Sequence, residues 1–259
     1  MSAAAYTERF DVNRVVVRTI DILRTNLVLI TALTLILFGL PKVGSAFLDF
    51  TTVDIPLFGR LFDITGFIYG LIAWFGFYAL QGAVNHVFAA DVNGRAPSLR
   101  QGLRIGVNFL LPVLCISLIM VVSFWVTVWF LIAPALIILT LWSMATPAAV
   151  FERLGVGDAL ARSSGLTQGY RWQVFAIGAV FFGVWCIVHS MLDNGHHHRH
   201  VQDALEYVGN VTHAIRQLLL AIFDTVAAPI GAVLTASTYY ELRMVKEGAG
   251  PEAVADVID

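Results

Sequence analysis

Charged side chains are scarce in this chain. Only 13% of its 259 residues are Asp, Glu, Lys or Arg, whereas 58% are hydrophobic. Soluble domains carry about 25% charged and about 45–50% apolar residues. A globule of this size could not hide the apolar excess, since its surface must still face water. The shortage of charge excludes an ordinary soluble protein and indicates an integral membrane protein.

Cysteines and catalytic motifs are also scarce. The two cysteines, Cys115 and Cys186, each lie inside an apolar run, so they make no disulfide framework. The sequence contains no Gly-x-Ser-x-Gly, HExxH, phosphate-binding loop or Cys-x-x-Cys motif. A net charge of −2 provides no basic field of the kind that attracts nucleic acid. These absences argue against an enzyme, a cofactor and a nucleic-acid partner.

Long apolar runs are abundant, and each has the length of a membrane-spanning helix. Such a helix needs about 20 mostly apolar residues. One run, 103–151, is too long for a single crossing, and we divide it near Pro134, which breaks helical hydrogen bonding. The sequence therefore predicts an all-α, polytopic helix bundle with six transmembrane helices. The predicted spans are 27–47, 64–90, 103–125, 132–149, 172–192 and 215–240, between an N-terminal segment 1–25 and a tail 241–259.

The distribution of Lys and Arg predicts the orientation of these spans. Twelve of the sixteen basic residues fall on the side that carries both termini. The other side has only Lys42, Arg60, Arg199 and Arg216. Because cytoplasmic loops are enriched in Lys and Arg, both termini are predicted to be cytoplasmic.

Three segments have patterns typical of helices that lie on a membrane surface. In 10–25, polar residues recur at helical spacing, which fits an interfacial helix or a cytoplasmic extension of the first span equally well. In 152–172, a short amphipathic piece is predicted to end at Gly165, with Thr167 capping the next helix. A further interfacial helix is predicted at 201–211.

The run from Pro134 to Phe175 resembles an uncharacterised bacterial six-helix membrane family. That family includes the membrane domain fused to some glycerophosphoryl diester phosphodiesterases. The matching residues are Pro134, Pro147, Glu152, Ala159, Leu160, Ser163, Leu166 and Thr167. The stretch from Tyr239 to Arg243 is similar to the family's ending, while Ala135 stands where the family commonly has Gly.

The resemblance implies a compact six-helix bundle with a structural elbow at Pro134, Pro147, Glu152, Ser163 and Thr167. It also implies a bacterial inner membrane. The fusion partner hints at lipid metabolism, but the matching motifs carry no reaction of their own.

Polar residues inside predicted spans are the first candidates for function. Asp224 lies in the last span, and a carboxylate in hydrocarbon is costly enough to suggest a functional role; the alternative is a packing carboxylate near the outer interface. Gln81, Asn85, His86 and Asn108 lie in the second and third spans and are typical of helix-joining amides and hydrogen-bonding histidines.

Arginines at the predicted cytoplasmic face form a second candidate site. They could bind anionic lipid head groups, or they could be solvated helix ends and weak salt bridges. The predicted rim consists of Arg14, Arg18, Arg95, Arg100, Arg153 and Arg162.

A third candidate is the loop 193–200, DNGHHHRH. His196, His198 and His200 alternate and could ligate a metal ion. Adjacent histidines cannot all reach one tetrahedral ion, and Arg199 repels a cation. We therefore favour a loop between membrane helices over a metal site.

Two functional hypotheses follow. The first is a non-enzymatic membrane protein that handles lipid, or an accessory subunit with membrane lipids, other subunits or a second copy as partners. The second is a small-solute or ion transporter that uses Asp224 and proline-kinked spans.

Overall fold

The structure is a computed structural model that describes residues 9–44, 64–128, 132–193 and 204–248. Every regular element in these residues is a helix, which confirms the all-α prediction. The helices are α1 (Val12–Thr25), α2 (Leu27–Thr34), the π-helical η1 (Leu35–Gly39), α4 (Ile64–Val92), α5 (Leu99–Asn108), α6 (Leu110–Val128), α7 (Ile132–Trp142), α8 (Ala145–Phe151), α9 (Val156–Thr167), α10 (Arg171–Asp193) and α11 (Ala204–Glu247).

Within the described residues, five helical stretches are long and apolar enough to cross a membrane, as in a multi-pass membrane protein. They are Leu27–Gly44, Leu110–Val128, Pro134–Phe151, Arg171–Leu192 and Ile215–Glu247. The predicted span 64–90 is one continuous helix, α4, but it is not among the five. Gln81, Asn85 and His86 make its described part more polar, so the predicted number of six is not confirmed.

The N-terminal segment is a separate helix that packs on the bundle. Asp11 caps α1, because its side chain accepts a hydrogen bond from the Asn13 backbone N–H. Val15, Thr19 and Ile22 form the buried face of α1, which lies against α11. α1 ends at Asn26, whose side chain donates to Asp91 of α4.

Two predicted spans are broken where the sequence analysis expected continuous helices. The span 103–125 is divided at Phe109, because α5 ends at Asn108 and a new helix, α6, starts at Leu110. The span 132–149 is divided at Ser143 and Met144, between α7 and α8. The first break separates the polar helix α5 from the apolar helix α6, whereas the second lies inside one apolar stretch, Pro134–Phe151.

The elbow that follows α8 differs from its prediction in two places. α9 continues through Gly165 to Thr167, and the left-handed turn residue is Gly169, with φ of 89°. Thr167 does not cap α10, because its hydroxyl donates to the backbone oxygen of Ser163 in its own helix. Glycine at the turn avoids the strain that a side chain would meet at this φ.

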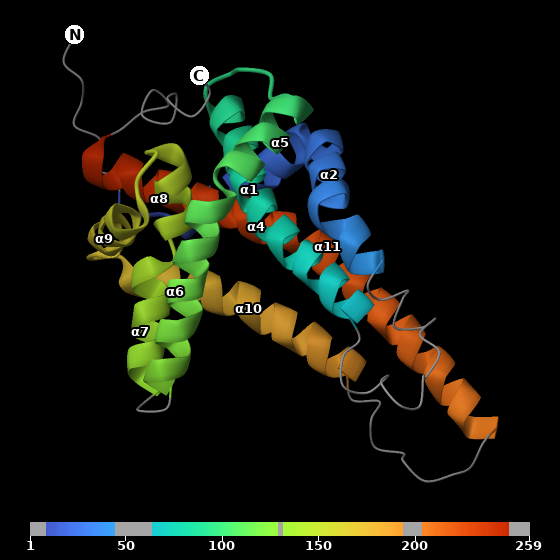
Figure 1. The fold of residues 1–259 in the computed structure, drawn as a ribbon. Coiled ribbons are helices and arrows are strands. Elements are labelled where there is room, and N and C mark those ends of the chain that lie inside the picture. Colours follow the sequence, from blue (N-terminus) through green and yellow to red (C-terminus); the bar gives the residue numbers. More distant parts are fainter. Residues whose placement is uncertain (1–8, 45–63, 129–131, 194–203, 249–259) are drawn as a thin grey trace.

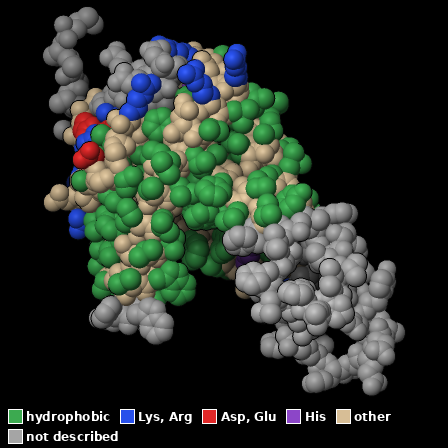
Figure 2. Space-filling model, viewed as in Figure 1, with side chains coloured by type: hydrophobic (Ala, Val, Ile, Leu, Met, Phe, Trp, Pro, Cys, Tyr) green, Lys and Arg blue, Asp and Glu red, His purple; other side chains and the backbone are tan. Residues whose placement is uncertain are grey.

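The core lies at one end of the molecule. There the second half of α4 packs on α8 and α11, and α9 packs on the same two helices, which together bury Val84, Phe88, Phe151 and Tyr239. From this end the α6–α7 hairpin diverges from the group formed by α2, α4 and α11, with α10 running diagonally between them (Figure 1). We call it the basic end, because Lys and Arg side chains gather there in Figure 2.

Close backbone contacts hold α4 in place. A Cβ added at Gly76 would lie 1.7 Å from the Leu37 carbonyl oxygen of η1, and Gly82 faces Gly106 of α5. These glycines serve contacts inside the bundle, whereas Gly70 has open space beside it.

Candidate functional site

An elongated pocket of about 600 Å³ lies between α4, α10 and α11. Each of the three helices contributes one stripe of residues at three- and four-residue spacing, the pattern of a single helical face. The main stripes are Gly70, Ala73, Trp74, Phe77 and Gln81 of α4; Val174, Ile177, Gly178, Phe181, Phe182 and Trp185 of α10; and Asp224, Ala227, Ala228, Gly231, Leu234, Thr235 and Thr238 of α11.

One end of the pocket carries a polar group that we call the Asp224 cluster, formed by Lys42, Trp185, His189 and Asp224. Trp185 Nε1 donates to Asp224 Oδ1 at 3.0 Å, and His189 Nε2 donates to the same oxygen at 2.9 Å. Lys42 Nζ lies 3.4 Å from Asp224 Oδ2. The carboxylate therefore joins α10 and α11 to the helical segment after η1.

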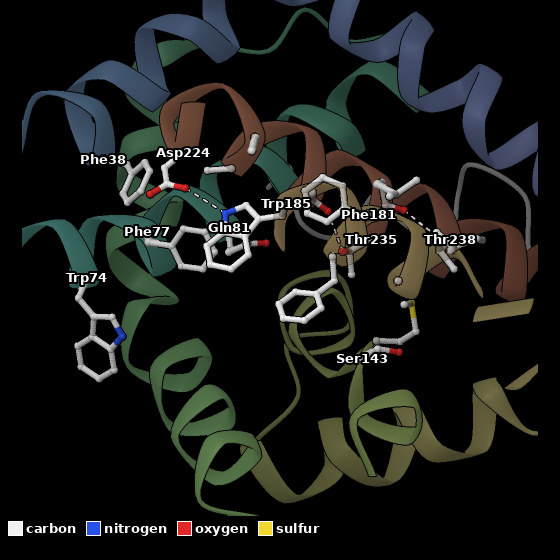
Figure 3. A pocket seen from close by; sticks show the side chains of 18 of the residues that line it. Phe38, Trp74, Phe77, Gln81, Ser143, Phe181, Trp185, Asp224, Thr235 and Thr238 are labelled. Atoms are coloured by element: carbon white, nitrogen blue, oxygen red, sulfur yellow. Dashed lines mark hydrogen bonds between the residues drawn. The ribbon is translucent and has the colours of Figure 1, made fainter. Parts of the chain in front are cut away.

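The opposite end of the pocket carries only neutral hydroxyls. Thr238 and Thr235 of α11 and Ser143 at the α7–α8 break line it. Asp224 and Thr238 are fourteen positions apart, which corresponds to about 21 Å along an α-helix. Figure 3 shows this arrangement, with Asp224 and Phe38 at one end and Thr238 and Ser143 towards the other.

The walls between these ends are mostly apolar, with Gln81 of α4 as a polar exception. Phe38, Phe77, Phe181 and Ile177 face the space together with small residues of α11. Gly178 adds no side chain, and a Cβ there would meet nothing within 4 Å. Figure 2 shows the surface hollowed between the α6–α7 hairpin and α4, with hydrophobic side chains on its walls. The pocket is thus suited to an apolar ligand with one polar end.

The elbow positions the hydroxyl end of this pocket. At the α7–α8 break, Ser163 Oγ donates to the Leu141 carbonyl at 2.6 Å and accepts from the Met144 backbone N–H at 3.1 Å. Helix ends leave such groups without partners inside the helix. One buried serine of α9 therefore holds the break that forms the pocket's inner wall.

The other elbow residues have structural positions. Pro134 and Pro147 lie in the first turns of α7 and α8, where a missing N–H is tolerated. Glu152 ends α8 and accepts hydrogen bonds from Tyr239 and, at 2.9 Å to each oxygen, from Arg162 Nε. These contacts join α8 and α9 to α11.

Three of the six predicted rim arginines are paired with acidic residues of the bundle. Arg14 Nε donates to the buried Glu241 at 2.8 Å, and Arg18 lies 3.5 Å from the same carboxylate. Arg162 also bonds Glu247, and this contact, together with Glu152, raises the pKa of the Arg162 guanidinium. These three arginines therefore contribute to tertiary packing, and their role as head-group ligands stays a prediction.

The remaining rim arginines are exposed. Arg95 follows the turn at Gly94, Arg100 lies on α5 one turn before Arg104, and Arg153 adopts a left-handed φ of 49° after α8. All three lie at the basic end, as a head-group rim requires.

The remaining predicted polar residues are separated by the fold. Gln81 lines the pocket. Asn85 and His86 are buried next to each other in α4, and neither the Asn85 Nδ2 nor the His86 ring nitrogens have a hydrogen-bond partner among the described residues. Asn108 is the exposed last residue of α5, just before the apolar stretch Leu110–Val128, and its predicted place inside a span stays a prediction. His196, His198 and His200 lie outside the described residues.

Sequence reasoning missed the pocket and the three partners of Asp224, which are Lys42, Trp185 and His189. In the sequence analysis, Lys42 was only one of the four basic residues on the side opposite the termini. No sequence signal links it to Asp224, which lies 182 positions later. A signal did exist in α11, where Asp224, Ala227, Ala228 and Gly231 place small residues on one face. Such a face indicates close approach of a neighbouring helix or ligand.

Comparison with known proteins found no matching family model, curated protein or solved structure. The relation to the membrane domain of glycerophosphoryl diester phosphodiesterases therefore stays a prediction.

Proposed function

We propose that this chain is a non-enzymatic membrane protein that holds a lipid chain in the pocket between α4, α10 and α11. The observation that carries the proposal is the apolar space of about 600 Å³ that three helical stripes line together. Ligand pockets have volumes of about 300–1,000 Å³ and mostly apolar walls with a few convergent polar groups. The Asp224 cluster provides such a group at one end.

The placement of charges supports a position across the bilayer. Asp224 and the buried Glu241 are seventeen positions apart, about 25 Å along α11. This separation is close to the hydrocarbon thickness of about 30 Å. Asp224 would then lie near one interface, and the pocket would lie between the two charged layers, open to acyl chains.

The basic end supports the remaining parts of the proposal. Its exposed arginines, including Arg100 and Arg153, are placed to contact anionic head groups. By the positive-inside rule this end would face the cytoplasm with both termini, in a bacterial inner membrane. Membrane lipids are the partners that we propose; partner subunits or a second copy stay predictions.

A second candidate function is transport of a small solute or ion. The ion pair of Asp224 with Lys42, beside His189, favours it, because intramembrane charge pairs occur on transport pathways. Flux through proteoliposomes that stops in Asp224→Asn and persists in Asp21→Asn, an exposed carboxylate of α1, would support this candidate. Flux that is equal in both variants would reject it.

Two glycines of α10 provide the test of lipid binding. Gly178 lines the pocket and Gly183 does not, and a Cβ at either would meet nothing within 4 Å. Gly178→Leu should fill the pocket without a clash, whereas Gly183→Leu adds the same side chain outside it. Mass spectrometry of the purified proteins should show bound lipid in wild type and Gly183→Leu and little in Gly178→Leu. Equal lipid content in all three would reject the proposal.

A further inference from the structure

The accessible charge at the polar end of the pocket is positive. The Lys42 side chain is 37% exposed, whereas Asp224 is 13% exposed. Trp185 and His189 both donate to Asp224 Oδ1, so the carboxylate is shielded behind its donors. A ligand head at this end would therefore meet the more exposed Lys42 ammonium before the Asp224 carboxylate.

The shape of the pocket limits the ligand to a narrow tail. About 600 Å³ drawn out over about 21 Å gives a mean cross-section of about 30 Å². A space of this volume fits one extended hydrocarbon chain. The length exceeds the roughly 15 Å that one leaflet's chains occupy in a hydrocarbon core of about 30 Å, so a full-length acyl chain fits.

We infer that the pocket binds a single-chain amphiphile with an anionic head. The carboxylate or phosphate contacts Lys42, and the tail runs along the α11 stripe towards Thr238. Hydrogen bonds between ions of opposite charge are stronger than neutral ones, which would fix the direction of the ligand. This inference rests on the proposed lipid-binding function and adds the number of chains and the charge of the head.

The test compares probes that differ in one feature at a time. Full-length protein in detergent is titrated with hexadecanoate, palmitoyl lysophosphatidate, hexadecanol, hexadecylamine and octanoate, and bound probe is measured by native mass spectrometry. We expect the two long anions to bind at least tenfold more tightly than the alcohol, the amine and the short anion. Preference for hexadecanoate would identify a carboxylate head, and preference for lysophosphatidate a phosphate head.

Variants then assign the binding to the pocket. Lys42→Gln should weaken both long anions about tenfold, as expected when one charged hydrogen bond is lost, and leave hexadecanol unchanged. Lys42→Arg keeps the charge and should keep the affinity. Gly178→Leu should weaken every long-chain probe, and Gly183→Leu none.

The outcomes separate this inference from the proposed function. Tighter binding of hexadecylamine than of hexadecanoate, or no effect of Lys42→Gln, would overturn the anionic head while Gly178→Leu still supports a lipid pocket. No effect of Gly178→Leu on any probe would overturn both. Circular dichroism and size exclusion of each variant ensure that lost binding is not lost folding.

Discussion

Single polar residues hold the places where the helices break. Ser163 is fully buried and bonds both sides of the α7–α8 break. Glu241 is buried and pairs with Arg14, so it joins α1 to the end of α11. In an apolar chain such residues are few, and each satisfies groups that would otherwise be buried without a partner, at a cost of about 1–3 kcal/mol each.

The residue Ser163 can be tested directly. Ser163→Ala leaves the Met144 N–H and the Leu141 carbonyl without the serine, so we expect the free energy of unfolding to fall by about 2 kcal/mol. Unfolding in mixed detergent and SDS micelles measures this change. Ser164→Ala is the matched control, because Ser164 Oγ bonds only the Ala161 carbonyl of its own helix. Equal effects of the two substitutions would contradict the role of Ser163.

At the scale of elements, α4 is the helix around which the others pack. It contacts η1, α5, α6, α8 and α11. Glycines permit the closest of these approaches, at Gly76 against η1 and at Gly82 against α5. By contrast, α10 is hardly buried and exposes Val180, Val184 and Ile187, which suits a helix that faces lipid on one side and the pocket on the other.

Substitution of two α4 glycines should distinguish the close helix contact at Gly76 from the open space at Gly70. Gly76→Ala would place a Cβ against the Leu37 carbonyl and should lower the free energy of unfolding by about 3 kcal/mol. Gly70→Ala meets open space and should raise it by about 1 kcal/mol, since alanine favours helix. Thermal unfolding in detergent measures both. A stable Gly76→Ala protein would show that α4 and η1 are not in this contact.

Much of the fold could be predicted from the sequence, but the site could not. Hydropathy predicted the helices α10 and α11, because a helix satisfies the backbone hydrogen bonds of a long apolar segment in lipid. It missed the break at Phe109, although α5 carries Arg100, Arg104 and Asn108 and α6 is apolar, and it missed the break at Ser143 inside an apolar run. The Asp224 cluster depends on tertiary contacts between Lys42, Trp185 and His189, and a pattern within one helix carries no such information.

For the whole molecule, the account predicts one orientation in the membrane. In a cysteine-free background, Met191→Cys at the end of α10 should react with a membrane-impermeant maleimide on intact bacterial cells. Arg100→Cys, at the basic end, should react only after the cells are opened. Both side chains are exposed in the folded protein, so accessibility reports the side of the membrane. Labelling of Arg100→Cys on intact cells would contradict a cytoplasmic basic end.

The central claim is that a lipid chain lies inside the pocket and not only around the bundle. Photo-crosslinking with a long-chain fatty acid that carries a diazirine at mid-chain, followed by peptide mapping, tests it most directly. The account predicts adducts on Ile177, Phe181 and Ala228, which line the pocket, and their loss in Gly178→Leu but not in Gly183→Leu. Adducts spread equally over the exposed face of α6, at Leu118 and Val122, with no effect of Gly178→Leu, would contradict it.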